Sequence, residues 1–209
     1  MTRIAITGAS GIGKTTLANA IGQRFGIPVL GEDLVTVTQA AQHYDKQFLN
    51  GDTAATADAM REYIRVCNEW MSERARLWQA HSEFVSDRCC FDILSRLLSG
   101  TAPKNEKVLV SLINECHRQS RRVELFVVPP ISPWSMKTGV NESGLRRNTL
   151  FSNKLRTNSM VIGLLRQFSA SPALLLPMSA TTTDQRCEHV EQALQKKRTA
   201  RKARATRGT

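Results

Sequence analysis

The sequence predicts an α/β fold: a doubly wound, mainly parallel, five-stranded sheet with helices on both faces. Three observations support this prediction. The chain begins with a β-rich run, a glycine-rich turn and a helical pattern; four more strand-like runs follow; and helical periodicity separates most of these runs. The 209 residues, 41% of them hydrophobic, suffice for one well-buried domain, which we place at residues 1–195.

The first half of the chain contains two short strands and two helical regions. Residues 3–7 (RIAIT) form the β-rich run, and residues 14–25 carry apolar side chains at helical spacing. A short strand over 28–30 ends at a loop that begins with Gly31. Residues 53–80 form a long amphipathic pattern, whose apolar face contains Met60, Tyr63, Ile64, Cys67, Trp70, Met71 and Trp78.

The second half continues the alternation of strand and helix. Strand-like runs occupy residues 83–87, 123–128 and 173–176. The helical spacing between them is carried by Leu109, Leu112, Ile113 and Cys116 and then, over 149–168, by Phe151, Leu155, Ile162 and Leu165. A last helix is expected over 184–196. Because the strands alternate with helices, we expect them to be parallel.

Residues 131–148 interrupt this alternation. The prolines of PPISPW end the fourth strand, because proline can neither donate to a strand ladder nor continue a helix. The residues that follow are polar, contain glycine and show no clear period. We interpret 131–148 as a lid segment.

Basic residues are concentrated at the carboxyl end. The formal net charge is +11, and removing the seven basic residues of 196–209 (KKRTARKARATRGT) leaves +4 for the remainder. This segment has no large apolar side chain, so we expect a disordered tail that attracts a polyanion such as nucleic acid. The alternative is a solubilising extension with no specific partner.

The sequence indicates neither a secretory leader nor a membrane-spanning segment. The start, MTRIAITGASGIGKTT, lacks a long apolar region, and no run of about eighteen apolar residues occurs. The five cysteines lie in apolar segments without CxxC spacing, as reduced structural thiols do. We therefore expect a cytoplasmic protein.

A glycine-rich motif at residues 8–15, GASGIGKT, matches the phosphate-binding pattern G-x-x-x-x-G-K-[ST]. It follows a predicted strand and opens a predicted helix, as that pattern requires; the alternative is a glycine-rich turn with an incidental lysine. Lys14 would reach the β- and γ-phosphates, and the Thr15 hydroxyl would bind Mg²⁺. The expected ATP-binding residues are Gly8, Ala9, Ser10, Gly11, Ile12, Gly13, Lys14, Thr15 and Thr16.

The second motif is FVSDRCCFD, residues 84–92. Asp87 ends a strand that is predicted to lie beside the strand before the phosphate-binding loop (P-loop, residues 8–15). There a carboxylate can hold Mg²⁺ directly or through water. The alternative is an N-cap carboxylate for the following helix. Arg88 follows at once, and Asp92 lies one turn into that helix. The NKxD and DxxG motifs of GTPases are absent. The pattern of four hydrophobic residues followed by Asp-Glu, which is typical of motor ATPases, is absent too.

Together these motifs resemble a known family. GASGIGKTT, the acidic LGEDL after the second strand, SDRCCFD, and the arginine-containing GLRRN are similar to motifs of the P-loop nucleoside and nucleotide kinases. The similarity is greatest to the branch of nicotinamide riboside kinase-type ATPase and kinase domains and small phage kinases. It spans residues 3–195 and implies a P-loop kinase fold with a lid.

The resemblance also implies catalytic roles. It places the acid that binds the acceptor or takes its proton at Glu32 or Asp33, for which solvated loop acids are the alternative. It makes Arg146 and Arg147 lid arginines that stabilise transition-state charge. The expected catalytic residues are Lys14, Glu32, Asp33, Asp87, Arg146 and Arg147.

For the substrates, the resemblance makes Arg88 a contact of the acceptor, because its planar guanidinium can grip a phosphate or a base edge. We expect Asp92 to be a second acceptor-binding residue. Residues 177–181 lie where the family places the adenine. The expected cofactors are ATP and Mg²⁺.

These expectations describe a phosphotransferase that acts on a hydroxyl of a nucleotide-type acceptor. The family default is a free nucleoside or nucleoside monophosphate. The basic tail favours instead an acceptor within DNA, as in phage enzymes that phosphorylate 5-hydroxymethyluracil in DNA during thymine hypermodification. An alternative of another class is a P-loop ATPase or a nucleic-acid-binding regulator without a kinase acceptor.

Overall fold

The computed structural model describes residues 1–31, 34–99, 106–131 and 151–205. Five strands form one sheet in the order β2-β3-β1-β4-β5, and every neighbouring pair is parallel. The strands are β1 (Arg3–Ile6), β2 (Val29–Leu30), β3 (Phe84–Asp87), β4 (Leu125–Val128) and β5 (Ala173–Leu175). The predicted five-stranded α/β fold is confirmed.

Seven helices within the described residues connect and cover the strands. They are α1 (Lys14–Phe25), α2 (Val35–Leu49), α3 (Thr53–Ala80), α4 (Cys90–Ser99), α5 (Glu106–Ser120), α6 (Phe151–Phe168) and α7 (Thr183–Ala205). The bounds of α1 and α3 are those predicted. The start of α3 is fixed by an N-cap, because the Asp52 carboxylate accepts the Ala55 amide at 2.9 Å. α2 has no counterpart among the predicted elements.

Two hydrophobic layers lie on the two faces of the sheet. Side chains alternate along a strand, so Ile4 and Ile6 of β1 pack with α1 and α7, whereas Ala5 packs with the layer formed by α2 to α6. Both faces of the parallel sheet are therefore covered. The loops at the carboxyl ends of the strands are left to form a site, as is usual in open α/β sheets.

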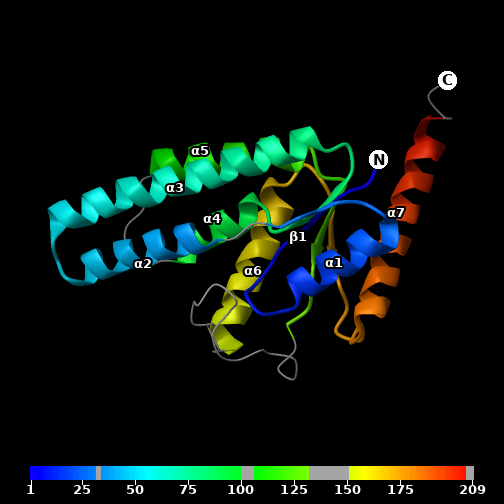
Figure 1. Ribbon diagram of the computed structural model, residues 1–209, viewed down its shortest axis with the longest axis horizontal. Coiled ribbons are helices and arrows are strands. Elements are labelled where there is room, and N and C mark those ends of the chain that lie inside the picture. Colours follow the sequence, from blue (N-terminus) through cyan, green and yellow to red (C-terminus); the bar gives the residue numbers. More distant parts are fainter. Residues whose placement is uncertain (32–33, 100–105, 132–150, 206–209) are drawn as a thin grey trace.

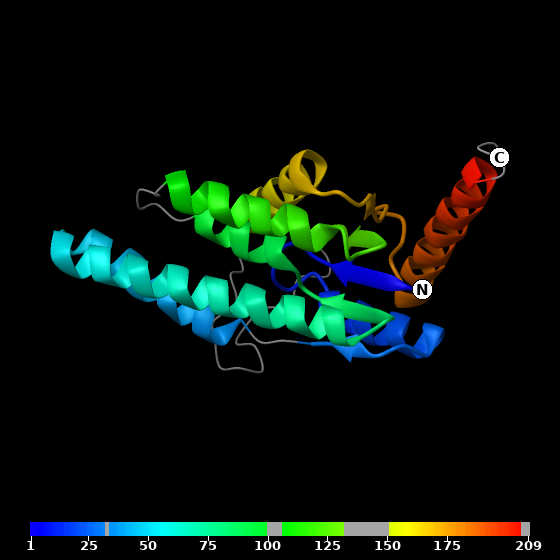
Figure 2. The same ribbon diagram turned by 90° about the horizontal axis from the view of Figure 1, so that it is seen from above.

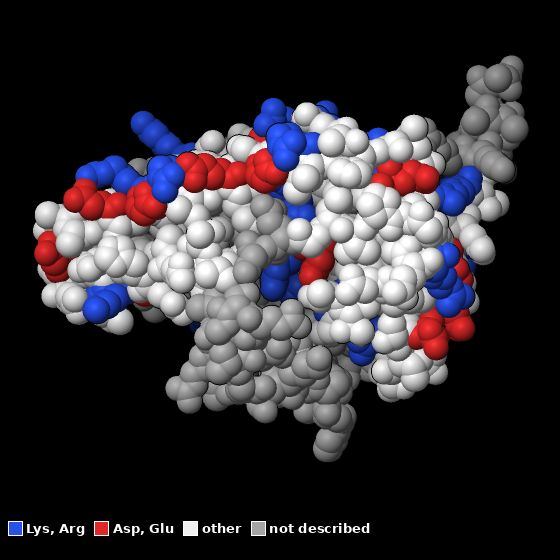
Figure 3. All heavy atoms as spheres, viewed as in Figure 1, with Lys and Arg blue, Asp and Glu red and all other residues white. Residues whose placement is uncertain are grey.

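α2 and α3 form a helical pair that extends past the sheet (Figures 1 and 2). Tyr44 of α2 and Tyr63 of α3 contact each other within it, with ring centroids 6.2 Å apart. The exposed face of α3 carries four ion pairs at i,i+3 and i,i+4 spacing, and Figure 3 shows acidic and basic groups side by side there: Arg61–Asp58, Arg65–Glu62, Arg65–Glu69 and Arg76–Glu73. Such pairs each contribute about 0.3–0.5 kcal/mol, so the apolar interface is the main stabilising contact.

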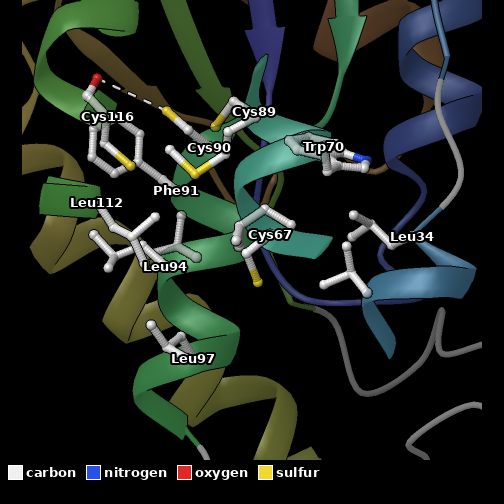
Figure 4. Packing of buried hydrophobic residues seen from close by; sticks show 14 of the residues in the cluster. Leu34, Cys67, Trp70, Cys89, Cys90, Phe91, Leu94, Leu97, Leu112 and Cys116 are labelled. Carbon is white, nitrogen blue, oxygen red and sulfur yellow. Dashed lines mark hydrogen bonds between the residues drawn. The ribbon is translucent and has the colours of Figure 1, made fainter. Parts of the chain in front are cut away.

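The cysteines are free and buried, as predicted. Four of them lie in the layer formed by α2 to α6, and Figure 4 shows Cys89, Cys90 and Cys116 beside Phe91. The Cys90 thiol donates to the Cys116 carbonyl at 3.9 Å. Burial raises the pKa of the Cys89 and Cys90 thiols well above its ordinary value, so both stay protonated at neutral pH.

α7 corrects the prediction of a disordered tail. The helix continues through residues 196–205, so disorder is the wrong description of that stretch. Lys197 donates to the carbonyl of Glu124, and Arg198 donates to the Thr2 hydroxyl at 2.7 Å. Lysine, arginine and alanine are good helix formers, and cations near a helix C-terminus interact favourably with the helix dipole. These contacts place the start of the basic segment at the amino ends of β1 and β4.

No helix in the described ranges is long and apolar enough to cross a membrane. The predicted lid, 131–148, lies outside the described residues except for Ile131. Ile131 packs against Ala9 and Ile12, so the chain that leaves β4 begins next to the P-loop.

Candidate functional site

The P-loop, residues 8–15, joins β1 to α1 at the carboxyl edge of the sheet. Gly8 and Gly13 have φ angles of 126° and 86°, which residues with a side chain rarely adopt. A Cβ atom at Gly8 would also lie 2.5 Å from Asn158 Oδ1. The glycine therefore lets the loop pass close to α6, and the main-chain amides at the start of α1 remain available to phosphate groups.

Buried side chains hold the P-loop from outside. Asp92 of α4 accepts hydrogen bonds from the Thr7 hydroxyl at 2.8 Å and from the Gly8 amide at 3.4 Å. Asn158 of α6 accepts the Ala9 amide at 3.1 Å. Both acceptors are buried, so water competes weakly for these bonds. The loop is therefore shaped before any ligand binds.

Lys14 is the first residue of α1 and only 4% exposed. Its ammonium group donates to the carbonyls of Gly8 at 2.8 Å and Ala9 at 2.6 Å. Burial, and secondarily the Arg88 charge, lower the pKa of Lys14 to about 8. Lys14 is therefore charged at neutral pH, in a position where an anionic ligand would stabilise it.

Thr15 and Asp87 meet at the end of the P-loop. Asp87 is the register partner of Ile6, which brings its carboxylate to the residues that follow β1. The Thr15 hydroxyl donates to Asp87 Oδ2 at 2.6 Å. Asp87 is 6% exposed, and its Oδ1 has no hydrogen-bond partner among the described residues.

These two residues fit the expected metal. A buried carboxylate oxygen without a partner is costly unless a ligand completes it. Mg²⁺ prefers oxygen ligands and is usually held by one or two protein groups together with substrate phosphates. Asp87 and Thr15 offer such a set. The Asp87 carboxylate bonds to Thr15 rather than to an amide of α4, so the alternative of an N-cap is not what the structure shows.

Arg88 follows Asp87 in an unusual conformation. Its φ of 91° is the one positive value at a non-glycine residue in the described ranges. The Arg88 charge contributes to lowering the pKa of Lys14, and also that of Arg96, where burial is the larger cause. No described residue bonds to the guanidinium group of Arg88 or Arg96. Figure 3 shows basic and acidic groups together where the helical pair meets the rest of the molecule.

Asp92 occupies a different place from the one expected of an acceptor-binding residue. It is buried behind the P-loop, and in addition to its P-loop contacts its Oδ2 accepts the Cys89 amide at 2.8 Å. Because Cys89 directly precedes α4, Asp92 joins the start of that helix to the phosphate site. This geometry supports a role as an anchor of the P-loop. Arg96, one helical turn further on, was missed by the sequence analysis; its four-residue spacing from Asp92 was the available signal.

The inner face of α6 differs from the predicted one. Phe151 and Leu155 are 39% and 48% exposed, whereas Lys154 and Asn158 are buried. The apolar pattern predicted the wrong face, because the inner face of α6 includes the polar Asn158, which accepts the Ala9 amide of the P-loop. Lys154 and Asn158 are four positions apart and therefore lie on one face of the helix, which is the pattern that indicates a polar inner face. Asn158 was not among the predicted site residues.

Four residues of the predicted catalytic set, Glu32, Asp33, Arg146 and Arg147, lie outside the described residues. Glu32 and Asp33 follow β2 in the sequence. β2 is the neighbour of β3 and ends at Leu30. The segment after Leu30 therefore starts at the same edge of the sheet as Asp87.

The start of α7 borders the P-loop. A capping box fixes this end, because the Gln185 amide donates to the Thr182 hydroxyl at 3.2 Å and the Thr182 amide donates to Gln185 Oε1 at 3.1 Å. Arg186 donates to the Ala180 carbonyl at 3.0 Å, and its Nη1 is 3.6 Å from the position of a Cβ at Gly13. The loop expected near the adenine thus lies beside the P-loop.

A P-loop flanked by a carboxylate on the neighbouring strand, in an all-parallel five-stranded sheet, defines a protein with the fold of P-loop nucleoside and nucleotide kinases. Residues 3–175 match a family model described as an AAA domain, and the chain belongs to that family. A comparison with curated proteins finds no match.

Solved structures with the same fold include nucleoside and nucleotide kinases. The deoxyadenosine kinase from M. mycoides with bound dCTP is 14% identical, with a TM-score of 0.59 and coverage of 92% of this chain and 98% of that one. The same enzyme with dCMP and dCDP is 16% identical, with a TM-score of 0.56 and the same coverage. The thymidylate kinase from Candida albicans is 12% identical, with a TM-score of 0.57 and coverage of 94% and 92%. At these identities the similarity establishes the fold.

Proposed function

We propose that the protein is an ATP- and Mg²⁺-dependent phosphotransferase that moves the γ-phosphoryl group to a hydroxyl of a nucleotide-type acceptor. The observation that carries this proposal is the contact of Thr15 with Asp87 beside the buried Lys14, with one Asp87 oxygen free of hydrogen-bond partners in the described part of the chain. A hydroxyl and a carboxylate for the metal and a cation for the phosphates are the protein groups that phosphoryl transfer uses.

The donor would lie along the P-loop. The amides at the start of α1 would bind its phosphates, and Lys14 would exchange the carbonyls of Gly8 and Ala9 for phosphate oxygens. Mg²⁺ held by Thr15 and Asp87 would neutralise phosphate charge. The loop after β5, next to the start of α7, would carry the base of the donor.

The acceptor would lie on the side of Arg88 and Arg96, whose guanidinium groups supply positive charge. Its hydroxyl oxygen would form a bond to the γ-phosphorus while the bond from that phosphorus to the β–γ bridging oxygen breaks, releasing ADP. The hydroxyl proton would pass to Glu32 or Asp33, which follow β2 at this edge of the sheet.

Arg146 and Arg147 are proposed, from the family resemblance, to close over the transferring group and stabilise its charge. Their segment follows β4, the other neighbour of β1. It therefore starts on the opposite side of the P-loop strand from β3, where a lid could cover the donor phosphates.

A free nucleoside or nucleoside monophosphate is the acceptor that the fold and the site support best. The similar structures are those of a deoxyadenosine kinase and a thymidylate kinase. In addition, the basic segment that favoured a larger acceptor starts at the amino ends of β1 and β4, whereas the P-loop follows the carboxyl end of β1. The length of β1, about 13 Å, separates the two positions.

A hydroxyl on a modified base in DNA, such as 5-hydroxymethyluracil in a phage thymine hypermodification pathway, is the second candidate. The charge of residues 196–209 supports it, since seven basic side chains suit a polyanion. A DNA acceptor would have to run along the molecule from α7 to the P-loop and present a flipped base to the site.

The experiment is transfer of label from γ-labelled ATP to four acceptors: free nucleosides, nucleoside monophosphates, plain DNA and DNA containing 5-hydroxymethyluracil. Label in a free nucleoside or monophosphate supports the first candidate, and label only in the modified DNA supports the second. The description of the family as an AAA domain favours a third outcome, in which the label passes only to water. That result would make the protein an ATPase and contradict the kinase proposal.

A further inference from the structure

Ser86 is the centre of a buried hydrogen-bond group beside the site. Its hydroxyl accepts a hydrogen bond from Arg74 Nη1 at 2.9 Å and another from Trp78 Nε1 at 3.1 Å, and it donates to the carbonyl of Arg88 at 2.8 Å. Ser86, Arg74 and Trp78 are fully buried. A hydroxyl has one hydrogen to donate and two lone pairs, so these three bonds use all of its capacity.

The direction of these bonds follows from the chemistry of the partners. A guanidinium group and an indole N–H can only donate. They therefore occupy both lone pairs of Ser86 Oγ and leave its hydrogen to the Arg88 carbonyl. Removal of either donor leaves the bond to Arg88 possible, whereas removal of the Ser86 hydroxyl ends it.

Arg88 needs such support because of its backbone conformation. A non-glycine residue at positive φ is strained, and it persists where the surroundings fix it. At Arg88, with φ of 91°, both main-chain polar groups are fixed: the amide donates to the Ile6 carbonyl at 2.8 Å and the carbonyl accepts from Ser86. The conformation turns the chain between Asp87, which faces Thr15, and the start of α4.

Arg74 connects the same group to the neighbouring strand. Its Nη1 also donates to the carbonyl of Leu30 at 2.9 Å, and its guanidinium carbon lies 4.8 Å from the ring centre of Trp70. Leu30 ends β2 and Ser86 lies in β3, so one buried cation ties together the ends of two strands that lead into the site. Burying the Arg74 charge costs free energy that a neutral side chain of similar size at the same position would not cost.

We propose that Ser86 is a positioning residue, which holds the Arg88 main chain in its left-handed conformation and so directs the Arg88 guanidinium toward the acceptor side of the P-loop. The conformation of Arg88 does not depend on any activity of the protein, whereas its consequence for catalysis rests on the function proposed above. It requires that Arg88 change conformation when the Ser86 hydroxyl is lost.

The first test is structural and needs no activity. A crystal structure of Ser86→Ala should show Arg88 shifted out of the positive-φ region, or its guanidinium displaced from the P-loop, while Trp78→Phe, which removes a donor to the same hydroxyl, should keep the wild-type Arg88. If Ser86→Ala crystallises with φ near 91° and an unmoved guanidinium, the inference is wrong even if the protein proves to be a kinase. Ser86→Thr, which keeps the hydroxyl, is the second variant should the alanine variant not fold, and it should retain the wild-type Arg88.

The second test is a double-mutant cycle with Arg88→Ala. With Arg88 present, Ser86→Ala should lower kcat/KM for the acceptor about tenfold. The Kd for ADP should stay within about twofold, because the hydroxyl bonds to Arg74, Trp78 and the Arg88 carbonyl rather than to the P-loop. In the Arg88→Ala background the same substitution should cost less than about twofold. An equal loss in both backgrounds would show a structural effect that does not act through Arg88. If the wild type transfers phosphate to no acceptor, the proposed function fails and the crystal structures still decide the inference.

Discussion

The Thr15 hydroxyl donates to Asp87 Oδ2 at 2.6 Å and thereby joins the first turn of α1 to the end of β3. The second Asp87 oxygen is buried without a hydrogen-bond partner among the described residues. We predict that Asp87→Asn, which preserves the shape and the bond to Thr15, raises the Mg²⁺ concentration needed for ADP binding about tenfold or more, because the charged ligand is lost. A Mg²⁺ titration of ADP binding measures this; an unchanged requirement would remove Asp87 from the metal site.

Asp92→Asn provides the matched control. Asp92 is a second buried carboxylate of the same region, but it bonds to the Thr7 hydroxyl and the Cys89 amide. We expect this variant to lose about 1–3 kcal/mol of unfolding free energy and to keep the Mg²⁺ requirement of the wild type. Denaturant unfolding and the same titration test it, and a raised Mg²⁺ requirement would place Asp92 near the metal.

Lys14→Ala should lower phosphoryl transfer by at least about 10³-fold, because the γ-phosphate loses its buried cation. The fold should remain, since within the described residues the Lys14 ammonium bonds to two P-loop carbonyls, those of Gly8 and Ala9. The measurement is single-turnover transfer together with a thermal unfolding curve. Near-normal turnover in a folded variant would contradict the assignment of the phosphate site.

The affinity for ADP should depend on pH through Lys14, whose pKa in the free protein is about 8. Bound phosphate favours the charged form, so the complex keeps this proton to a higher pH than the free protein. Affinity should therefore be constant from about pH 7 to 8 and fall by up to about tenfold per pH unit above that. Calorimetry in buffers of different ionisation enthalpy should show proton uptake on binding at pH 9 and little at pH 7; no uptake at pH 9 would contradict the lowered pKa.

Gly8→Ala should destabilise the protein by about 2 kcal/mol or more, from the positive φ together with the contact with Asn158. A Cβ would lie 2.5 Å from Asn158 Oδ1 and 3.1 Å from Ile12 Cδ1. Asn158→Ala in the same chain should recover only part of this loss, because the φ of 126° is unchanged. If Asn158→Ala restored the whole of the lost unfolding free energy in urea, the close contact with Asn158 alone would explain why position 8 requires glycine.

Truncation after Gln195 tests the basic segment. The Kd for ADP should stay within about twofold of the wild type, because Lys197 and Arg198 contact Glu124 and Thr2 at the edge of the sheet remote from the P-loop. Binding to DNA should weaken, and the dependence of its logarithm on log salt should become shallower by about 0.9 for each lost phosphate contact. Unchanged DNA affinity across salt would make the segment a solubilising extension.

Strong local signals explain what the sequence predicted well. The helices over 14–25 and 53–80 have clear apolar stripes and end signals, such as Gly26 after the first and the N-cap Asp52 before the second, and their bounds agree with α1 and α3. The P-loop is recognisable because its glycines and lysine are required at fixed spacing. In the structure Lys14 donates to the carbonyls of Gly8 and Ala9, and Thr15 donates to Asp87.

Tertiary contacts explain what was missed. α2 begins with four β-branched residues, Val35 to Thr38, and buries only Val37 and Tyr44, so its stability comes from packing on α3 rather than from its own pattern. The turns of α7 beyond residue 195 depend on contacts with Glu124 and Thr2, which no local pattern shows.

Buried polar residues were the other signal left unused. Arg74 lies on the same helix face as the aromatic residues of α3, Ser86 interrupts an apolar strand, and Asn158 faces inward from α6. A polar residue within an apolar stripe requires a buried partner, and each of these three has one near the phosphate site.

The measurement that tests the central claim most directly is the fate of the γ-phosphate when wild-type protein is incubated with γ-labelled ATP, Mg²⁺ and the panel of acceptors. The predicted result is label in the hydroxyl of a nucleoside or nucleotide, absent with the Lys14→Ala variant. Label found only as inorganic phosphate with every acceptor would contradict the account.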